Sequence, residues 1–285
     1  MLKRQKTYED NMSAKLYLVG TPIGNFQDMT YRAVDTLKYV DEIYCEDTRI
    51  TGLLLKHFEI PTKMHSYHIY NEKELSSSII EKIKSGKNIA VVSDAGMPSI
   101  SDPGYLIATI AIQNDIDVCI IPGVSAGITA LVGSGIPSNK FTFVGFLNSK
   151  DNKRKEELEQ LKFKEETLIL YEAPHRIKET LEMLNDIMPN REIVLARELT
   201  KKYEEYLRGT SKEILEVVEE LKGEMVIIIS GCQNEEKVAK LISLSIKEHY
   251  RFYIENGYEN KEAMKLVAKD RGISKSEVYQ EIMKK

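Results

Sequence analysis

Residues 93–104, Ser-Asp-Ala-Gly-Met-Pro-Ser-Ile-Ser-Asp-Pro-Gly, form a dense group of side chains that can bind or react. The aspartates can accept protons or bind cations, the glycines allow close backbone approach, and the prolines stiffen the chain. An apolar run, residues 88–93, precedes them and is typical of a strand buried on both faces. Ligands of open parallel sheets bind beyond the carboxyl ends of strands. We therefore predict that this loop is the ligand-binding centre; the alternative is a rigid turn with capping aspartates.

A second candidate, residues 123–127, matches the Gly-x-Ser-x-Gly pattern between a strand and a helix. This is the setting of a nucleophilic serine, so a serine hydrolase is one hypothesis. Glu172 and His175 follow Ser125 in the required order, but they are only three residues apart. The alternative is that Ser125 and the amides near Ala126 hold a ligand at a helix N-terminus.

Charged side chains follow three other predicted strands. Any of them can face the same crevice as acids, bases or phosphate contacts, although capping and surface ion pairs explain such residues equally well. Residues 20–25 contain neither the dinucleotide fingerprint nor the Lys-Ser/Thr of a P-loop, which argues against NAD and nucleoside triphosphates. The charged side chains in question are Glu46, Asp47, Arg49, Glu172, His175, Arg176, Arg197 and Glu198.

Short apolar runs alternate with segments of helical spacing, which predicts an α/β fold with a parallel sheet in its first part. We expect a disordered lead-in at 1–13, α/β domains at 14–137 and 138–234, and a helical basic appendage at 235–285. The expected strands are 15–19, 41–45, 88–93, 118–121, 141–145, 167–171, 192–196 and 225–230. The expected helices are 30–40, 75–85, 105–113, one from about 126, 156–163, 175–187 and 211–221. Polar loops are expected at 63–71 and 148–155.

The chain has 285 residues and a net charge of −4, so it is not uniformly attractive to nucleic acid. From Lys237 onward, however, 11 Lys and Arg face 7 Asp and Glu, a local charge of +4 that is typical of a segment for an acidic partner. Two helical patterns there flank a turn at Arg271, and Ser274 with Glu277 predicts a capping box. The three cysteines are far apart in sequence, so we expect a reducing, cytoplasmic setting and no metal site. No apolar run is long enough to predict a membrane span.

Five segments together resemble the tetrapyrrole-methylase superfamily, and within it the bacterial methyltransferases of small-subunit ribosomal RNA. They are residues 18–25, 46–49, 93–104, 122–126 and 171–176, and the resemblance extends over about 15–285. It implies two α/β domains with a cofactor cleft between them, a helical C-terminal appendage and a homodimer. It also implies that S-adenosylmethionine is the methyl donor. The implied acceptor is the ribose 2′-hydroxyl of a cytidine in the decoding region of 16S rRNA, within the 30S subunit.

The resemblance also implies the site residues. Met97 is one departure, because the family often has threonine there; a hydroxyl contact with the ligand would be missing from this chain. By position, the implied cofactor contacts are Pro22, Asp94, Ala95, Gly96, Ile100, Ser101, Ser125, Ala126, Tyr171, Glu172 and Ala196, with Gly223 as a lesser candidate.

Methyl transfer to a hydroxyl requires positioning of two reactants and benefits from a base. Glu46, Asp47, Glu172, His175 and Glu198 are the candidate bases, and the sequence does not choose among them. Asp94 and Asp102 are expected to position the loop rather than act as a catalytic pair. The expected RNA phosphate contacts are Arg49, Lys153, Arg154, Arg176 and Arg197, together with the positive tail.

Three alternatives to this hypothesis stay open at this point. The same cleft could methylate another acceptor, such as a tetrapyrrole. The chain could be a serine hydrolase, or a non-catalytic protein that binds RNA or assists ribosome assembly.

Overall fold

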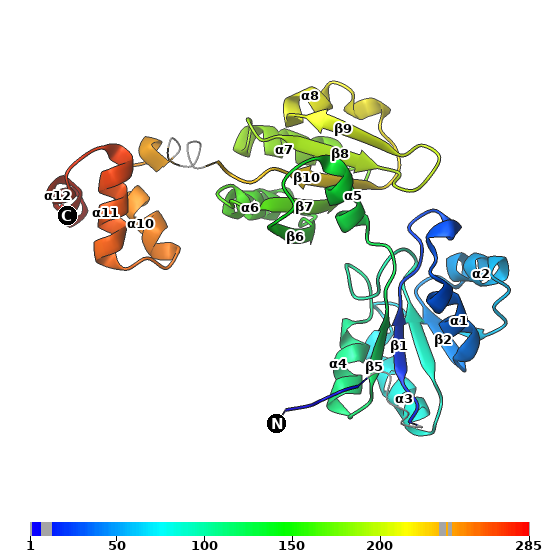
Figure 1. Ribbon diagram of the computed structural model, residues 1–285. Coiled ribbons are helices and arrows are strands. Elements are labelled where there is room, and N and C mark those ends of the chain that lie inside the picture. The colour runs from blue at the N-terminus through cyan, green and yellow to red at the C-terminus, as the bar shows by residue number, and fades with distance from the viewer. Residues whose placement is uncertain (1, 7–12, 234–237, 239–240, 285) are drawn as a thin grey trace.

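The computed structural model describes residues 2–6, 13–233, 238 and 241–284. Two α/β domains and a separate group of C-terminal helices follow one another along the chain (Figure 1). Among the described residues, no helix is both long and apolar enough to span a membrane.

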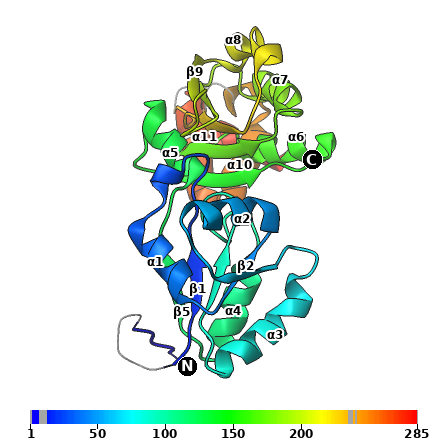
Figure 2. The ribbon, with the colours of Figure 1, turned by 90° about the vertical axis from the view of Figure 1, so that its right-hand side faces the viewer.

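The first domain is built on a parallel sheet of five strands, which confirms the expected parallel arrangement. Its central strand, residues 89–92, is fully buried because helices cover both faces of the sheet (Figure 2). The strand order is β3 (Lys63–Ser66), β2 (Glu42–Cys45), β4 (Ile89–Val92), β1 (Leu16–Val19) and β5 (Val118–Ile121). One face carries α1 (Tyr31–Tyr39) and α2 (Thr48–His57), which follow the short helix η1 (Phe26–Asp28), and the other carries α3 (Glu72–Lys84) and α4 (Tyr105–Gln113).

Two predictions for this domain are wrong. Residues 63–66 form edge strand β3 rather than a polar loop, and this strand lacks an apolar run because none of its four residues is buried at the edge of the sheet. The lead-in is not wholly disordered: Gln5 exchanges side-chain hydrogen bonds with the Val118 backbone at 2.9 and 3.0 Å, and Lys3 donates to Ile112 O at 2.6 Å. Residues 7–12 of the lead-in lie outside the described residues.

The second domain contains a mixed sheet of five strands. β10 lies antiparallel between β7 and β8, and the edge strand β9, which the sequence did not indicate, pairs antiparallel with β8. The strand order is β6 (Phe141–Phe146), β7 (Thr167–Glu172), β10 (Met225–Ile229), β8 (Ile193–Arg197) and β9 (Glu205–Gly209). One face packs on α5 (Ala126–Ser134), and the other on α6 (Asp151–Leu161), α7 (Ile177–Ile187), α8 (Ser211–Leu215) and η2 (Val218–Glu220).

The packing of α5 places the boundary between the two α/β domains earlier in the chain than predicted. Ala130 and Leu131 of α5 belong to the same apolar cluster as Ile169 and Val194 of the second sheet. The boundary predicted at residue 137 therefore falls after a helix that already packs with the second domain. The prediction of a polar loop at 148–155 is also wrong in part, since helix α6 begins at Asp151. Its first turns resemble a loop in the sequence because the buried face of the helix is narrow and the exposed face is strongly polar.

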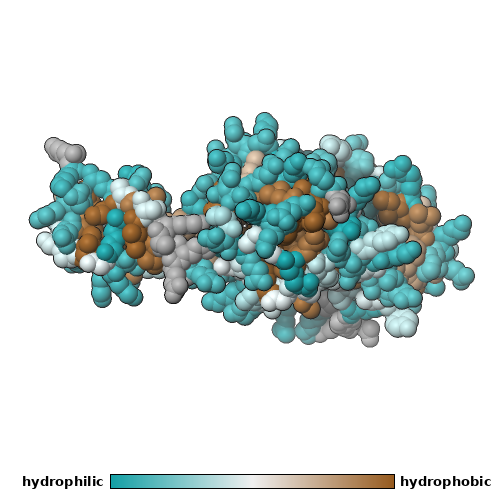
Figure 3. All heavy atoms as spheres, turned by 90° about the horizontal axis from the view of Figure 1, so that it is seen from above, coloured by the Kyte–Doolittle hydropathy of each residue, from teal (hydrophilic) through white to brown (hydrophobic). Residues whose placement is uncertain are grey.

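The C-terminal appendage is helical where it is described, as predicted: α10 (Ile246–Glu255), α11 (Asn260–Arg271) and α12 (Lys275–Met283). The capping box between Ser274 and Glu277 at the start of α12 is confirmed. The helices enclose a small apolar core of their own, and apolar patches interrupt a largely hydrophilic surface on the face seen from above (Figure 3). The Phe252 ring meets Phe163 of the second domain edge-on, with centroids 5.0 Å apart.

A buried polar cluster joins α10 to α11. Arg271 Nε donates to Nδ1 of the fully buried His249 at 3.1 Å, which fixes that nitrogen as an acceptor. His249 Nε2 lies 3.2 Å from the Asp270 carboxylate, and Tyr253 Oη donates to the same carboxylate at 2.5 Å. The cluster thus requires a neutral imidazole beside an arginine.

Acidification is expected to loosen the appendage. Burial and the nearby Arg271 lower the pKa of His249 below its usual 6.5, against the opposing effect of Asp270. As the pH falls through 6.5, the unfolded chain takes up a proton that the folded appendage resists, so stability is lost on the acid side. Hydrogen exchange of α10 and α11, corrected for the intrinsic rate, should accelerate between about pH 7.5 and 5.5. Equal acceleration in α1, which contains no histidine, would contradict this explanation.

Candidate functional site

The loops that follow β1 and β4 are bonded to each other. Thr21 N donates to Gly96 O at 2.8 Å, and Gly96 N donates to Thr21 O at 3.1 Å. Ser93 Oγ adds a third bond to Gly96 O at 3.0 Å. Gly96 has a φ of +84°, a left-handed conformation that glycine adopts without strain. The loop that the sequence predicts to bind ligand is therefore held in one shape from its first residues.

Met97 ties this loop to a third loop, after β5. Its Sδ accepts a hydrogen bond from Gly123 N at 3.2 Å, so the methionine sulfur has a structural role of its own at the position where the resemblance suggested threonine. Gly123 in turn lies against Gly20 at the end of β1. A Cβ added to Gly20 would fall 2.8 Å from Gly123 Cα, closer than real Cβ contacts allow. The backbones meet only because both residues are glycine.

One edge of the second sheet faces these three loops. β6, β7 and β8 end there, and β10 begins there because it runs in the opposite direction. Tyr171 Oη accepts a hydrogen bond from Gly127 N, in the first turn of α5, at 3.1 Å. The rings of Phe143 and Phe146 pack edge-on against Tyr171, with centroids 5.1 and 5.6 Å away. Burial raises the pKa of the Tyr171 hydroxyl, which keeps it neutral.

A cavity of about 330 Å³ lies where the two edges meet. Its volume is within the range of small-molecule sites. Apolar side chains form most of its wall, three carboxyl groups are its charged part, and none of the described residues that line it is basic. The lining residues are Ile23, Ala95, Gly96, Met97, Ile100, Ser101, Asp102, Ser125, Ala126, Phe146, Tyr171, Glu172, Ala173, Pro174, Leu199, Glu224, Met225 and Val226.

Comparisons with known proteins agree with this architecture. Residues 15–215 match the family model of the tetrapyrrole (corrin/porphyrin) methylases. The ribosomal RNA small subunit methyltransferase I of Bacillus subtilis (strain 168) is 48% identical, over 98% of each chain. The chain belongs to the tetrapyrrole methylase family.

Solved structures show the same fold at low identity. The methyltransferase CobJ has a TM-score of 0.60 at 17% identity and covers 77% of this chain and 95% of its own. A uroporphyrin-III C-methyltransferase from Thermus thermophilus, solved with S-adenosylhomocysteine, has a TM-score of 0.54 at 17% identity and covers 76% of this chain and 97% of its own. The two-domain fold and the methyltransferase class expected from the sequence are thus confirmed, and the non-catalytic alternative is wrong.

Most of the family contacts inferred by position meet at the cavity. Eight of the eleven line it: Ala95, Gly96, Ile100, Ser101, Ser125, Ala126, Tyr171 and Glu172. Pro22 is buried and does not line it, and Ala196 lies in the core under α5. Asp94 stands beside the cavity, where its Oδ1 accepts a hydrogen bond from Asp47 N at 2.9 Å and so joins the β2 and β4 loops. Gly223 lies next to the Glu198 side chain, off the wall.

The cavity is also lined by residues that the sequence did not single out, above all Leu199 and residues 224–226 at the start of β10. The prediction looked for ligand contacts at the carboxyl ends of strands, whereas an antiparallel strand brings its amino end to the same edge. Only the strand order reveals this.

The serine hydrolase hypothesis is wrong. No histidine lines the cavity beside Ser125 among the described residues, and His175 is exposed on the outside. Glu172 is bonded elsewhere: Thr180 Oγ1 donates to it at 2.5 Å and Ala173 N at 2.9 Å.

Several predicted RNA contacts are not free to bind phosphate. Arg154 is 1% exposed and pairs with Asp151, with Glu179 at 3.0 Å and with Thr180 at 3.1 Å, so this prediction is wrong. Arg176 Nη2 donates to the Leu147 and Asn148 carbonyls at 3.1 Å. Arg197 is bonded to Glu205 at 2.6 Å. Lys153 is exposed, as is Arg49, which pairs with Asp47 at 2.6 Å.

The glycine contact between β1 and β5 can be tested directly. Gly20→Ala should lower the free energy of unfolding by about 1–3 kcal/mol, because its Cβ would overlap the Gly123 backbone, which cannot turn aside as a side chain would. Gly52→Ala in α2 is the matched control: its Cβ would meet only the flexible end of Met64, and alanine favours helix. Urea unfolding should show a lower midpoint for the first and an unchanged or higher one for the second. Equal midpoints for both variants would contradict the assigned contact.

Proposed function

We propose that this methyltransferase transfers a methyl group from S-adenosylmethionine to the ribose 2′-hydroxyl of a cytidine in the decoding region of 16S rRNA. The observation that carries the choice of acceptor is the extent of the similarity. The family model ends at residue 215, whereas the Bacillus subtilis relative, named for small-subunit ribosomal RNA, is similar over 98% of the chain. The similarity therefore includes the basic appendage, which a small pigment substrate would not require.

The cavity suits the chemistry of the donor. Its apolar wall, including Ile23, Leu199 and Val226, can cover an aromatic base, while Ser125 and Ala126 bring the amino end of α5, which favours polar and anionic groups, to the same wall. Its carboxyl groups, with no basic residue among the described lining, favour a ligand that carries positive charge. When bound, S-adenosylmethionine supplies an activated methyl group, and the protein positions the reactants and keeps water out.

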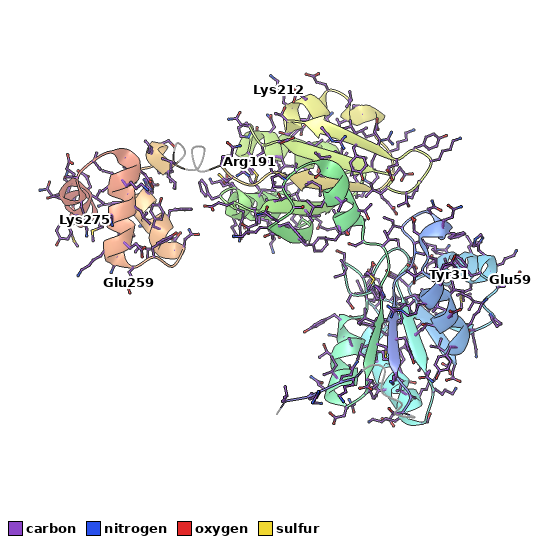
Figure 4. The ribbon with its side chains drawn as sticks, in the orientation of Figure 1. Tyr31, Glu59, Arg191, Lys212, Glu259 and Lys275 are labelled. Atoms are coloured by element: carbon purple, nitrogen blue, oxygen red, sulfur yellow. The ribbon has the colours of Figure 1, made fainter. Side chains whose placement is uncertain are left out.

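The appendage supports an RNA acceptor. Lys261, Lys265 and Lys269 are spaced four residues apart, so they form one exposed row along α11. Lys275 begins α12 on the same appendage, which lies away from the first domain (Figure 4). Such a row can contact phosphates along a strand and hold a large substrate while one nucleotide enters the cleft.

We further propose that the protein works in the cytoplasm as a homodimer. α4 and α5 are apolar on nearly all sides, yet Ile128 and Val132 are 44% and 78% exposed. Ile120 of β5 and Phe143 of β6 border the same apolar hollow of about 510 Å³ as Ile128. A second copy of the chain is the partner that would cover such a surface on every molecule.

The dimer surface is tested with Val132→Glu. A buried carboxylate without a partner should raise the dimer dissociation constant about tenfold or more. Tyr31→Glu is the control, since Tyr31 is also an exposed apolar side chain, at 93%, but lies on α1, on the face of the first sheet opposite α4 (Figure 4). Sedimentation velocity should show dissociation only for the first variant. A monomeric wild-type protein would reject the proposal.

The appendage is tested through salt dependence. Lys265→Ala combined with Lys269→Ala should weaken binding to 30S subunits and reduce the slope of log K against log salt by about 2, one for each phosphate contact. Affinity for S-adenosylmethionine should not change. The control is Lys38→Ala with Lys84→Ala, two exposed lysines in the last turns of α1 and α3. Equal slopes in all three proteins would refute phosphate binding by α11.

The activity itself is tested by transfer of a labelled methyl group to unmethylated 30S subunits, to bare 16S rRNA and to a tetrapyrrole. Digestion of the RNA to nucleosides should yield 2′-O-methylcytidine. Label on a base would correct the chemistry, and label on the tetrapyrrole alone would overturn the acceptor.

A further inference from the structure

Two exposed aromatic side chains stand on the segments that continue the cavity wall. Ile23 lines the cavity from the first domain, and soon after it comes Phe26, at the start of η1. Leu199 lines the cavity from the second domain, and soon after it comes Tyr203, in the loop between β8 and β9. Phe26 is 40% exposed and Tyr203 is 64% exposed. Each of the two wall segments thus continues into a ring that meets solvent.

The two segments also contact each other. The aliphatic part of the Lys201 side chain lies against Gly24, where an added Cβ would fall 2.5 Å from Lys201 Cγ. The loop between β8 and β9 accordingly lies over the short blue helix η1 at the top of the first domain (Figure 1). Phe26 and Tyr203 each follow this contact by two residues. The two rings therefore border the same part of the gap between the domains.

The loop that carries Tyr203 is held in one conformation. Glu198 and Thr200 have left-handed φ values of +50° and +67°, which are uncommon for residues with a side chain. Lys201 Nζ donates to Glu198 Oε1 at 3.1 Å and to Glu224 Oε2 at 3.0 Å. A strained backbone persists only where the surrounding contacts fix it, and such strain is typical of functional sites. The Tyr203 ring is therefore presented to solvent by a fixed loop.

Phe26 is supported from one side. The centroid of its ring lies 4.6 Å from that of His57 and 6.1 Å from that of Phe58, at the end of α2. Asn25 Oδ1 accepts a hydrogen bond from Gln27 N at 3.0 Å and so caps η1. The supported ring keeps an exposed surface on which a second flat group can stack.

The charges beside the rings favour an anionic partner. Lys202 is exposed, and its Nζ lies 5.3 Å from the centroid of the Tyr203 ring. Lys56, next to His57 in the last turn of α2, is exposed as well. Proteins that bind single-stranded nucleic acid stack bases on such rings while nearby cations meet the phosphates. The core of a protein interface is instead depleted of lysine.

We propose that Tyr203 and Phe26 form a stacking site for unpaired bases of the RNA acceptor, beside the nucleotide that enters the cavity. The assignment rests on the proposed function and deepens it. Bases that flank the target cytidine stack on the two rings, and their phosphates lie near Lys202 and Lys56. Sequence-specific recognition of RNA commonly uses unstacked bases in this way. The rings position the ribose hydroxyl at the cavity and leave binding of the donor unchanged.

The test is single-turnover methyl transfer to unmethylated 30S subunits, with saturating S-adenosylmethionine, at several subunit and salt concentrations. Tyr203→Ala should raise the subunit concentration for half-maximal rate about tenfold or more, by the same factor at every salt concentration, because stacking releases no counterions. Lys202→Ala should instead reduce the slope of log K against log salt by about 1. Calorimetry should show donor affinity within about twofold of wild type for both variants.

Conservative and control variants separate the ring from its surroundings. Tyr203→Phe should retain most of the affinity, since stacking needs the ring and not the hydroxyl. Phe26→Leu keeps an apolar contact with His57 but removes the ring, and should weaken subunit binding about threefold or more. Tyr39→Ala is the control and should match wild type: Tyr39 is 65% exposed, but it is the last residue of α1, at the opposite end of the first domain.

A fluorescent reporter tests stacking directly. The chain contains no tryptophan, so Tyr203→Trp introduces a single indole ring. Its emission should be quenched when 30S subunits bind, after subtraction of the signal that the wild-type protein gives with the same subunits. The emission of Tyr39→Trp should not change.

Three results would overturn the stacking site. They are half-maximal concentrations within about twofold of wild type for both Tyr203→Ala and Phe26→Leu, a loss as large for Tyr203→Phe as for Tyr203→Ala, and unquenched emission of Tyr203→Trp on bound subunits. A wild-type protein that methylates no ribose refutes the proposed function, and the stacking site with it. That outcome is distinguishable, because the Tyr39→Ala control is then inactive too.

Discussion

The contact between the backbones of Gly20 and Gly123 is the constraint on which the site depends. It joins the ends of β1 and β5 with no room for a side chain, and Met97 Sδ attaches the β4 loop to the same point. The chain then continues directly into α5, which packs on the second sheet. One close approach therefore sets both the shape of the ligand loop and the position of the second domain above it.

The charge distribution follows from the same arrangement. Carboxyl groups from both domains, Asp102, Glu172 and Glu224, meet at a mainly apolar cavity, while the exposed lysine row lies on the appendage. The cavity thus suits a cationic small molecule and the appendage an anionic polymer. Under the proposed function, this separation would let a large RNA be held without lysines among the residues that line the donor cavity, where they would oppose binding of a positively charged donor.

Much of this could be predicted because the relevant signals are local. Apolar runs such as residues 88–93 and the capping residues of the appendage identified buried strands and helix starts, and residues 93–104 identified a loop that lines the cavity. The failures concern contacts between distant residues. Neither the antiparallel direction of β10 nor the ion pair between the buried Arg154 and Glu179 is visible in a local pattern. The raised pKa of Asp102 was missed for the same reason, since Glu46 and Asp94 come near it only in the folded chain.

The central claim is that the methyl donor binds between the two domains. A crystal structure of the protein with S-adenosylhomocysteine tests it most directly. We expect the ligand in the cavity of about 330 Å³, in contact with residues of both walls, among them Gly96 and Tyr171. Ligand bound at any other place, with this cavity filled only by water, would contradict the account.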